Sequence, residues 1–278
     1  MSLSKTGHLH YGRNDLKARL MEALSVAGLS EKRLSTRDLA PLDQFHIRGL
    51  AATVELGAAA GIGRGSRVID IGSGLGGPSR YLAETFDCRV AGIDLSAAFV
   101  DAATYLAERA GLGDKVAYDC ADALAIPYEN ERFDVAWTQH VSMNIADRAG
   151  LYAEVYRVLR SGGRFAIYDV VAGDGGPLHF PVPWSRAAET SFLMTPSAMR
   201  AALEQQGFRV VAWSDGTEAG LSWIEKQKAT APASATASPS RLGLHIVMGP
   251  EFPAMTANFS RNLREGRVGL IQAVLERP

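Results

Sequence analysis

A glycine-rich turn at residues 72–77 constrains the fold of this chain more than any other stretch. Residues 67–71 are of strand type and run directly into Gly-Ser-Gly-Leu-Gly-Gly, which Pro78 follows. Proline suits the first turn of a helix, because its missing N–H group would have no partner there. Glycine lets a ligand approach the backbone closely, and the helix that follows directs free N–H groups at that ligand. The stretch predicts a nucleotide-cofactor loop at the carboxyl end of the first strand of an α/β sheet.

Two classes of cofactor are compatible with this loop. Gly72, Gly74 and Gly77 match the dinucleotide pattern G-x-G-x-x-G, and Asp94 follows at the distance expected of a ribose-binding acid. Asp70, however, lies inside the strand, where a dinucleotide-binding sequence usually has an apolar residue. A carboxylate at that position suits a ligand with an ammonium group better than a pyrophosphate.

The loop resembles the first motif of the class I S-adenosylmethionine-dependent methyltransferases, acid-x-Gly-x-Gly-x-Gly, in Asp70, Gly72, Gly74 and Gly76. Motifs over residues 67–170, and the layout to residue 278, look most like two small-molecule subgroups. One makes C-methylated quinones, as in ubiquinone and menaquinone biosynthesis. The other methylates the nitrogen of glycine, sarcosine, dimethylglycine or phosphoethanolamine.

The resemblance implies S-adenosyl-L-methionine as the cofactor and a Rossmann-like sheet of seven strands. Helices would cover both faces, and the last strand would be antiparallel. It implies an enzyme that methylates a small molecule, and an amine nitrogen is the favoured acceptor because residues 38–46 look closer to the amine subgroup. C- or O-methylation of a quinol, phenol or similar ring is the alternative. Outside the class, a nicotinamide-dependent oxidoreductase would need a set such as Tyr-x-x-x-Lys, which the sequence lacks.

Composition restricts the other classes. With 278 residues, 47% of them hydrophobic, the chain has ample material for a core, and its formal net charge is −1. A nucleic-acid-binding protein would need a basic patch, and none is visible. No apolar run approaches a membrane span, no signal peptide is recognisable, and Cys88 and Cys120 have no metal-ligand spacing. We therefore expect a cytoplasmic enzyme without a metal or membrane insertion, with a small-molecule acceptor as its partner and homodimerisation as an open alternative.

Residues 1–63 are predicted to form an N-terminal helical lid segment. One helix is expected over residues 15–27, with Leu16, Leu20 and Leu24 on one face, and residues 35–38 offer helix-capping chemistry. A second helix is expected from about Gln44 until glycine ends it at residues 61–63. Its apolar stripe would consist of Ile47, Leu50, Ala51, Val54 and Ala58. The resemblance implies that this segment packs over the cofactor, which makes Gln44, His46 and Arg48 candidates for lining the acceptor pocket.

Residues 64–278 are predicted to form the methyltransferase domain. Strands are expected over residues 67–71, 89–93, 116–120, 133–138, 164–170, 208–213 and 268–275. The helix over residues 147–160 would stop at Gly162 and Gly163. Residues 226–241, most of which are Ala, Ser, Thr or Pro, are predicted to be a flexible insertion between the last two strands.

Parallel strands end at the same crevice, so polar residues there can converge on one ligand. The resemblance assigns the ribose hydroxyls to Asp94, the adenine amine to Asp122 and the adenine ring to the Ala123 N–H group. Leu95 would pack on the adenine or the ribose. The full predicted cofactor set is Asp70, Gly72, Ser73, Gly74, Gly76, Asp94, Leu95, Asp122, Ala123 and Gln139.

His140 is the predicted catalytic residue, because it follows the fourth strand beside the expected position of the transferable methyl group. It could serve as a general base, orient the acceptor, or contact only the methionine part of the cofactor. Residues 139–144 differ from the Asn-Pro-Pro-Tyr and Asp-Pro-Pro-Tyr motifs, which disfavours nucleobase and glutamine substrates. Further acceptor-site candidates are Asn144, Tyr168, Asp169, His179 and Trp184.

Overall fold

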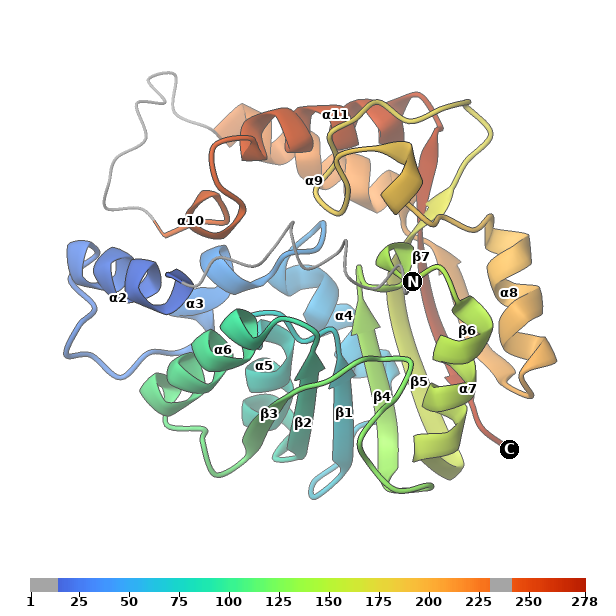
Figure 1. Ribbon diagram of the computed structural model, residues 1–278, viewed down its shortest axis with the longest axis horizontal. Coiled ribbons are helices and arrows are strands. Elements are labelled where there is room, and N and C mark those ends of the chain that lie inside the picture. Colours follow the sequence, from blue (N-terminus) through green and yellow to red (C-terminus); the bar gives the residue numbers. More distant parts are fainter. Residues whose placement is uncertain (1–14, 231–241) are drawn as a thin grey trace.

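The computed structural model describes residues 15–230 and 242–278 (Figure 1). A seven-stranded sheet has the order β3-β2-β1-β4-β5-β7-β6. The strands are β1 Arg67–Ile71, β2 Arg89–Asp94, β3 Val116–Cys120, β4 Phe133–Gln139, β5 Leu159–Ala172, β6 Arg209–Asp215 and β7 Val268–Glu276. β1 to β5 pair in parallel, whereas β7 lies antiparallel between β5 and β6. The predicted Rossmann-like sheet with an antiparallel last strand is confirmed.

Helices cover both faces of the sheet, as expected for buried parallel strands. They are α2 Leu16–Val26, α3 Thr36–Asp43, α4 Leu50–Ala59, α5 Gly77–Phe86, α6 Ala97–Ala110, α7 Arg148–Val158, α8 Pro196–Gln205, α9 Thr217–Thr230, α10 His245–Met248 and α11 Phe252–Arg264. α9 and α11 lie on the side towards which the strands β1–β4 point (Figure 1).

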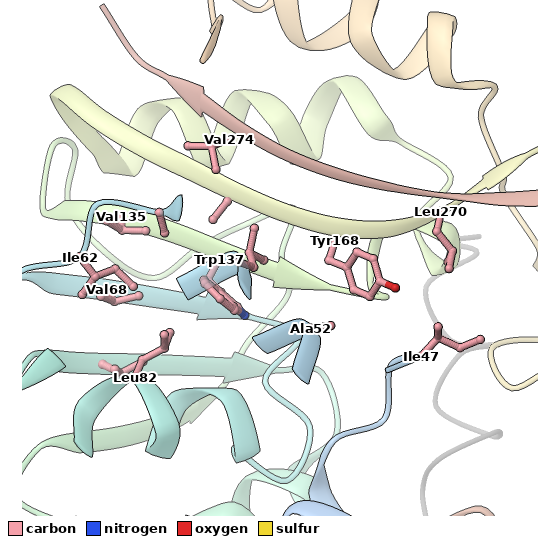
Figure 2. Close-up of a cluster of buried hydrophobic side chains, with 14 of the residues drawn as sticks. Ile47, Ala52, Ile62, Val68, Leu82, Val135, Trp137, Tyr168, Leu270 and Val274 are labelled. Carbon is pink, nitrogen blue, oxygen red and sulfur yellow. The ribbon is translucent and has the colours of Figure 1, made fainter. Parts of the chain in front are cut away.

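The core has two main halves, because successive strand residues face opposite sides of the sheet. Val68 packs with α4, α5 and α11 on one side, whereas Ile69 packs with α7 and α8 on the other. Figure 2 shows the first of these halves, in which Trp137 and Tyr168 lie on the same side of the sheet as Ala52 of α4. This half of the core therefore extends to the carboxyl ends of β4 and β5.

The N-terminal segment differs from the prediction after residue 35. Ser35 and Asp38 form a reciprocal capping box that starts α3, a helix of its own. Residues 44–49 form a turn instead of the start of the second helix, and α4 begins only at Leu50. α4 buries Ala52, Thr53, Leu56 and Gly57, whereas Val54 of the predicted stripe is 44% exposed. The stripe was wrong because most residues of α4 are apolar, so periodicity does not identify its buried face.

Two further predicted element boundaries differ from those of the structure. α7 ends at Val158, and β5 begins at Leu159, so Gly162 and Gly163 lie inside the strand. They exchange backbone hydrogen bonds with Arg277, which prolongs the ladder beyond β7. α9, which was not predicted, extends to Thr230, so residues 226–230 of the expected flexible insertion are helical. Residues 231–241 lie outside the described residues.

Candidate functional site

The glycine loop has the backbone conformation that its sequence predicts. Gly72, Gly74 and Gly76 have φ angles of 72°, 53° and 73°, in the region that side-chain-bearing residues rarely adopt. A Cβ at Gly72 would lie 2.6 Å from Val141, and one at Gly76 would overlap with the Tyr118 hydroxyl. The loop is therefore packed between residues that follow β4 and the ring of Tyr118 on β3.

Asp94, at the end of β2, holds this loop in place. Its Oδ2 accepts a hydrogen bond from the Gly74 N–H group at 2.9 Å, and its Oδ1 accepts one from the Ser96 N–H group at 2.9 Å. The Ser96 side chain in turn caps α6 by accepting from the Phe99 N–H group. The acid predicted to bind the ribose thus lies directly beside the cofactor loop.

Asp70 is buried in β1, where its Oδ2 accepts a hydrogen bond from the Ser79 hydroxyl at 2.5 Å. Burial raises the pKa of Asp70 to about 7, and the nearby charge of Asp94 acts in the same direction. Asp70 therefore ties β1 to the start of α5. Its predicted contact with the cofactor's ammonium group, through water or loop N–H groups, stays a prediction.

The residues predicted to bind adenine lie at the ends of β2 and β3. Asp122 is half-buried, and its Oδ1 accepts from the Leu124 N–H group at 2.9 Å, as a turn-capping acid does. Ala123 and Leu95 are also half-buried. The parallel pairing of β2 with β3 brings the three residues to one edge of the sheet.

Residues 43–45 pack directly on the glycine loop. The ring of Phe45 lies 3.1 Å from the position of a Cβ at Gly74. Asp43 forms an ion pair with Arg80 of α5 at 2.6 Å, and both side chains are almost fully buried. Burial raises the pKa of Asp43 to about 6, although the charge of Arg80 opposes that effect. The N-terminal segment is thus attached to the loop by one buried ion pair and one aromatic contact.

A group of buried or half-buried polar side chains, which we call the polar cluster, lies beside the loop at the carboxyl end of β4. Its members are Gln44, His46, Thr53, Gln139, His140 and Tyr168. The Thr53 hydroxyl is central, with Gln44 Oε1 at 2.7 Å, His46 Nε2 at 3.1 Å and Gln139 Oε1 at 3.1 Å. The ring of His140 lies 5.2 Å from that of Tyr168 and 6.0 Å from that of His46, between centroids. The cluster joins the N-terminal segment to β4 and β5.

Two residues at the polar cluster have strained backbones. His140 has a φ of 53° and Arg48 a φ of 66°, a region that costs free energy for residues with a side chain. The His140 N–H group donates to the Tyr168 carbonyl at 2.8 Å, which holds this conformation. Such strain is concentrated at functional sites in proteins.

Both histidines of the cluster are kept neutral by their surroundings. Burial lowers the pKa of His46 to about 4. Burial, and after it repulsion by His46, lowers the pKa of His140 well below its usual value. Each ring therefore carries a lone pair at neutral pH, but a lowered pKa makes His140 a weak base.

The other predicted acceptor-site residues have different surroundings. Asn144 is exposed and donates to the Val141 carbonyl, whereas buried Asp169 accepts from the Val141 and Ser142 N–H groups and from the Ser142 hydroxyl. Asp169 thus shapes the turn that carries His140.

The two residues from the long loop are separated by the structure. Trp184 is buried and packs on Phe259 at 5.1 Å between ring centroids, and Phe259 lies 6.2 Å from His140. Trp184 therefore lies behind the polar cluster, with Phe259 between it and His140. His179 instead pairs with Glu265 at 2.8 Å. Its backbone N–H group donates to Asn262 Oδ1 and its carbonyl accepts from Asn262 Nδ2, and neither Glu265 nor Asn262 belongs to the cluster.

Sequence reasoning missed Thr53, Phe45 and the Asp43–Arg80 pair. The available signal for Thr53 was a threonine among the mostly apolar residues of a predicted helix. Within the described ranges, the helices are too short or too polar to cross a membrane.

Comparisons with known proteins agree with this geometry. A family model described as a methyltransferase domain matches residues 69–167. Methyltransferase GfsG of Streptomyces halstedii is 34% identical over 134 residues, 48% of this chain and 48% of that protein. The sarcosine/dimethylglycine N-methyltransferase of Halorhodospira halochloris is 31% identical over 156 residues, 56% of each chain. The chain thus spans about half the length of these curated relatives.

Solved structures share the whole fold at low sequence identity. A geranyl diphosphate C-methyltransferase from Streptomyces coelicolor A3(2), in complex with S-adenosyl-L-homocysteine, has a TM-score of 0.69 and 18% identity, and the match covers 98% of this chain and 95% of that one. The (4+2)-cyclase SpnF has a TM-score of 0.68 and 20% identity, with 96% and 97% covered.

Proposed function

The chain carries a class I methyltransferase domain, and on this premise we propose that it transfers a methyl group from S-adenosyl-L-methionine to a small-molecule acceptor. The observation that carries the proposal is the glycine loop at the end of β1. Three of its glycines have positive φ, and the Gly74 N–H group donates a hydrogen bond to Asp94, the acid that ends β2. Together they form a cradle for a nucleoside with an amino-acid tail.

The residues at the strand ends fit this cofactor. Asp94 would accept from the ribose hydroxyls, Asp122 and Ala123 would bind the adenine, and Gln139 would lie near the methionine part. The cofactor supplies a methyl group on a positively charged sulfur. The chain's own contribution is then to hold the acceptor atom at attacking distance and to exclude water, which the buried polar cluster is suited to do.

His140 is proposed to act at the acceptor. Its imidazole is neutral, so its lone pair can accept a hydrogen bond or a proton from the acceptor. General bases work best when their pKa lies near the working pH. Because burial lowers the pKa of His140, orientation of the acceptor is the role that the structure favours.

An amine nitrogen is the acceptor that we propose first. The sarcosine/dimethylglycine N-methyltransferase shares 31% identity with the chain over 56% of its own length. Methylation at carbon is the second candidate, because the sterol 24-C-methyltransferase ERG6 of Saccharomyces cerevisiae is 30% identical over 162 residues, 56% of this chain and 42% of that enzyme. The larger share of the amine enzyme that is matched supports the first choice.

Residues 1–63 are proposed to be the lid of this site. The described part, from residue 15 onward, contacts the glycine loop through Phe45 and α5 through Asp43. It also supplies Gln44, His46 and Thr53 to the polar cluster. A segment that touches both the cofactor loop and the polar cluster is well placed to exclude water from both.

Isothermal titration with S-adenosylmethionine and with NADH tests the cofactor assignment. We expect saturable binding of S-adenosylmethionine only. Asp94→Asn should weaken that binding by at least tenfold, because it removes the charge from two hydrogen bonds to the ribose. Asp101→Asn, at an exposed acid of α6, is the control and should bind like the wild type. Binding of NADH alone, or unchanged affinity in Asp94→Asn, would contradict the assignment.

A further inference from the structure

Four side chains of the polar cluster have buried polar atoms that lack a hydrogen-bond partner among the described residues. These atoms are Gln44 Nε2, Gln139 Nε2, His140 Nε2 and the Tyr168 hydroxyl. A buried polar group without a partner is costly, so native proteins provide one from the protein, from water or from a ligand. The four atoms belong to residues around Thr53 and His140 and therefore describe one site.

The tautomer of His46 follows from its neighbours. Its Nε2 lies 2.9 Å from the Gly49 carbonyl, which can only accept, so Nε2 carries the hydrogen. The same N–H group faces the Thr53 oxygen at 3.1 Å. The Thr53 hydroxyl consequently receives from His46 and has its single hydrogen left to donate.

That hydrogen fixes the orientation of Gln44. Gln44 Oε1 is the nearest acceptor to the Thr53 hydroxyl, at 2.7 Å. Gln139 Oε1 is held separately, because it accepts from the Trp137 indole N–H group at 3.1 Å. Both amide oxygens thus accept a hydrogen bond. Both amide nitrogens, with two hydrogens each, are among the atoms that lack a partner.

The surplus at this site consists mainly of hydrogen-bond donors. The two amide nitrogens can only donate. The Gln44 amide donates towards the neighbouring Asp43 carboxylate, which leaves its second hydrogen and both hydrogens of Gln139. The Tyr168 hydroxyl also has a hydrogen to donate. The positive charge of Arg48 also lies near that hydroxyl, although Glu55 pairs with Arg48 at 2.5 Å. Two unpartnered atoms of the described residues can accept beside Tyr168: Gln272 Oε1 on β7, and His140 Nε2 when the ring hydrogen is on Nδ1. The hydrogens of the two amides and of Tyr168 outnumber these acceptors, so an oxygen that only accepts would meet more partners here than an ammonium group would.

We propose that the polar cluster binds a carboxylate or carbonyl oxygen of the methyl acceptor, and that Thr53 is the positioning residue that keeps the Gln44 amide turned as a donor. This inference rests on the proposed function and adds the chemical class of acceptor to it. The cofactor's own carboxylate has the same chemistry. The donors, however, extend from β4 to Tyr168 on β5, away from Asp94 and Asp122 on the other side of β1. Gln139 is itself proposed to lie near the methionine part of the cofactor, so it is the donor one strand farther on, Tyr168 of β5, that favours the acceptor as the source of the oxygen.

Thr53→Val and Thr53→Ser test the positioning role. Valine keeps the shape of threonine without its hydroxyl, and serine keeps the hydroxyl. Thr104→Val is the control, because Thr104 lies exposed on α6 and, among the described residues, its hydroxyl donates to the Val100 carbonyl of its own helix. Thermal unfolding of each variant identifies any that fail to fold. If Thr53→Val does not fold, the preference of the wild type within each ligand series below still tests the class of oxygen.

Ligand binding to the protein saturated with S-adenosylhomocysteine provides the readout. Dimethylglycine, its amide and 2-(dimethylamino)ethanol share one amine and differ in offering a carboxylate, a carbonyl or a hydroxyl. 4-Hydroxybenzoate, its amide and 4-hydroxybenzyl alcohol form the same series on a phenol. We expect the carboxylate or carbonyl member of a series to bind at least tenfold more tightly than the alcohol. Thr53→Val should weaken this preference, because it releases the Gln44 amide, and Thr53→Ser and Thr104→Val should keep it.

Three results would overturn the inference. They are preference for the alcohols, a preference that Thr53→Val leaves unchanged, and failure of all six compounds to bind the loaded protein. Titration of Thr53→Val with S-adenosylhomocysteine and with 5′-methylthioadenosine, which lacks the amino-acid tail, separates the two oxygen sources. Weaker binding of the first compound alone would assign the cluster to the cofactor and overturn the inference too. If the wild type binds no S-adenosylhomocysteine, it is the proposed function that fails.

Discussion

At the scale of single residues, His140 combines a strained backbone with a buried, neutral ring. Its conformation is held by the Tyr168 carbonyl, and its ring lies between those of Tyr168, His46 and Phe259. The first cofactor glycine is next to it in space, because Val141 touches Gly72. His140 is thus adjacent to the loop without being part of it.

We predict that His140→Ala lowers turnover by ~10²–10⁴-fold while the affinity for S-adenosylmethionine stays close to that of the wild type. His140→Gln should keep part of the activity if the ring orients the acceptor, because an amide can still form a hydrogen bond. Steady-state kinetics and calorimetry on the three proteins measure both quantities. Loss of cofactor binding in His140→Ala would instead assign the ring to the methionine part of the cofactor.

Asp70 gives a prediction for pH. Its pKa of about 7 in the folded protein lies above the ordinary 3.8, so between these values the folded state binds more protons at Asp70 than the unfolded state. The stability that this carboxyl contributes is therefore complete below about pH 4 and is lost as the pH rises towards 7. Asp70→Asn should remove that fall, which is at most ~4 kcal/mol for three pKa units.

Denaturant unfolding of wild type and Asp70→Asn between pH 4 and 8 isolates this contribution as a difference. The difference between the two proteins is needed because buried His46, with a pKa of about 4, has the opposite effect. Its contribution to the stability of the protein decreases as the pH falls below 6.5. Curves that run parallel at every pH would show that Asp70 does not titrate in this range.

Local chemistry could be predicted at this scale, and distant partners could not. The glycines of the loop and the cap at Ser35 follow from residue type and spacing. The partners of Thr53 include Gln139, 86 residues away in the sequence. Their meeting depends on how α4 packs against the sheet, which no short pattern encodes.

At the scale of elements, α3 and α5 are joined by the buried pair of Asp43 and Arg80. Arg80 also donates to the Ala103 carbonyl of α6 at 3.4 Å. Gly77 makes the approach of α3 possible, because a Cβ there would lie 2.5 Å from an Asp43 oxygen. The start of α5, which carries the cofactor loop, is thereby fixed to the N-terminal segment.

We predict that Asp43→Asn destabilises the protein by ~3–5 kcal/mol, because it leaves the charge of Arg80 buried without its partner. The double variant Asp43→Asn with Arg80→Met should recover much of this loss, since it removes the uncompensated charge. Urea unfolding at pH 8, above the raised pKa of Asp43, is the measurement. If the double variant is no more stable than Asp43→Asn, the buried charge is not the cause.

Element boundaries were predictable where capping residues mark them and unpredictable where apolar residues run on. Thr195 and Pro196 begin α8, and Gly111 ends α6. The start of α4 was misplaced by six residues of turn, in which Arg48 and Gly49 adopt positive φ. An arginine at position 48 does not indicate a positive φ, whereas a glycine there would have indicated one.

At the scale of the whole molecule, the alternation of strands and helices predicts an α/β sheet, and the order β3-β2-β1-β4-β5-β7-β6 confirms it. The antiparallel β7 was expected from the resemblance to a family, because periodicity does not give strand direction. The polar cluster, at which we propose that the acceptor binds, draws its members from three separate parts of the chain.

The most direct test of methyl transfer uses S-adenosylmethionine labelled with ¹³C in its methyl group. The protein is incubated with amines, phenols and quinols, and mass spectrometry follows the label and S-adenosylhomocysteine together. We predict that one acceptor gains a single labelled methyl per turn and that S-adenosylhomocysteine forms in equal amount. Tight binding of the cofactor with no label transferred to any compound of the panel would contradict the account and favour a protein that uses this fold without methyl transfer.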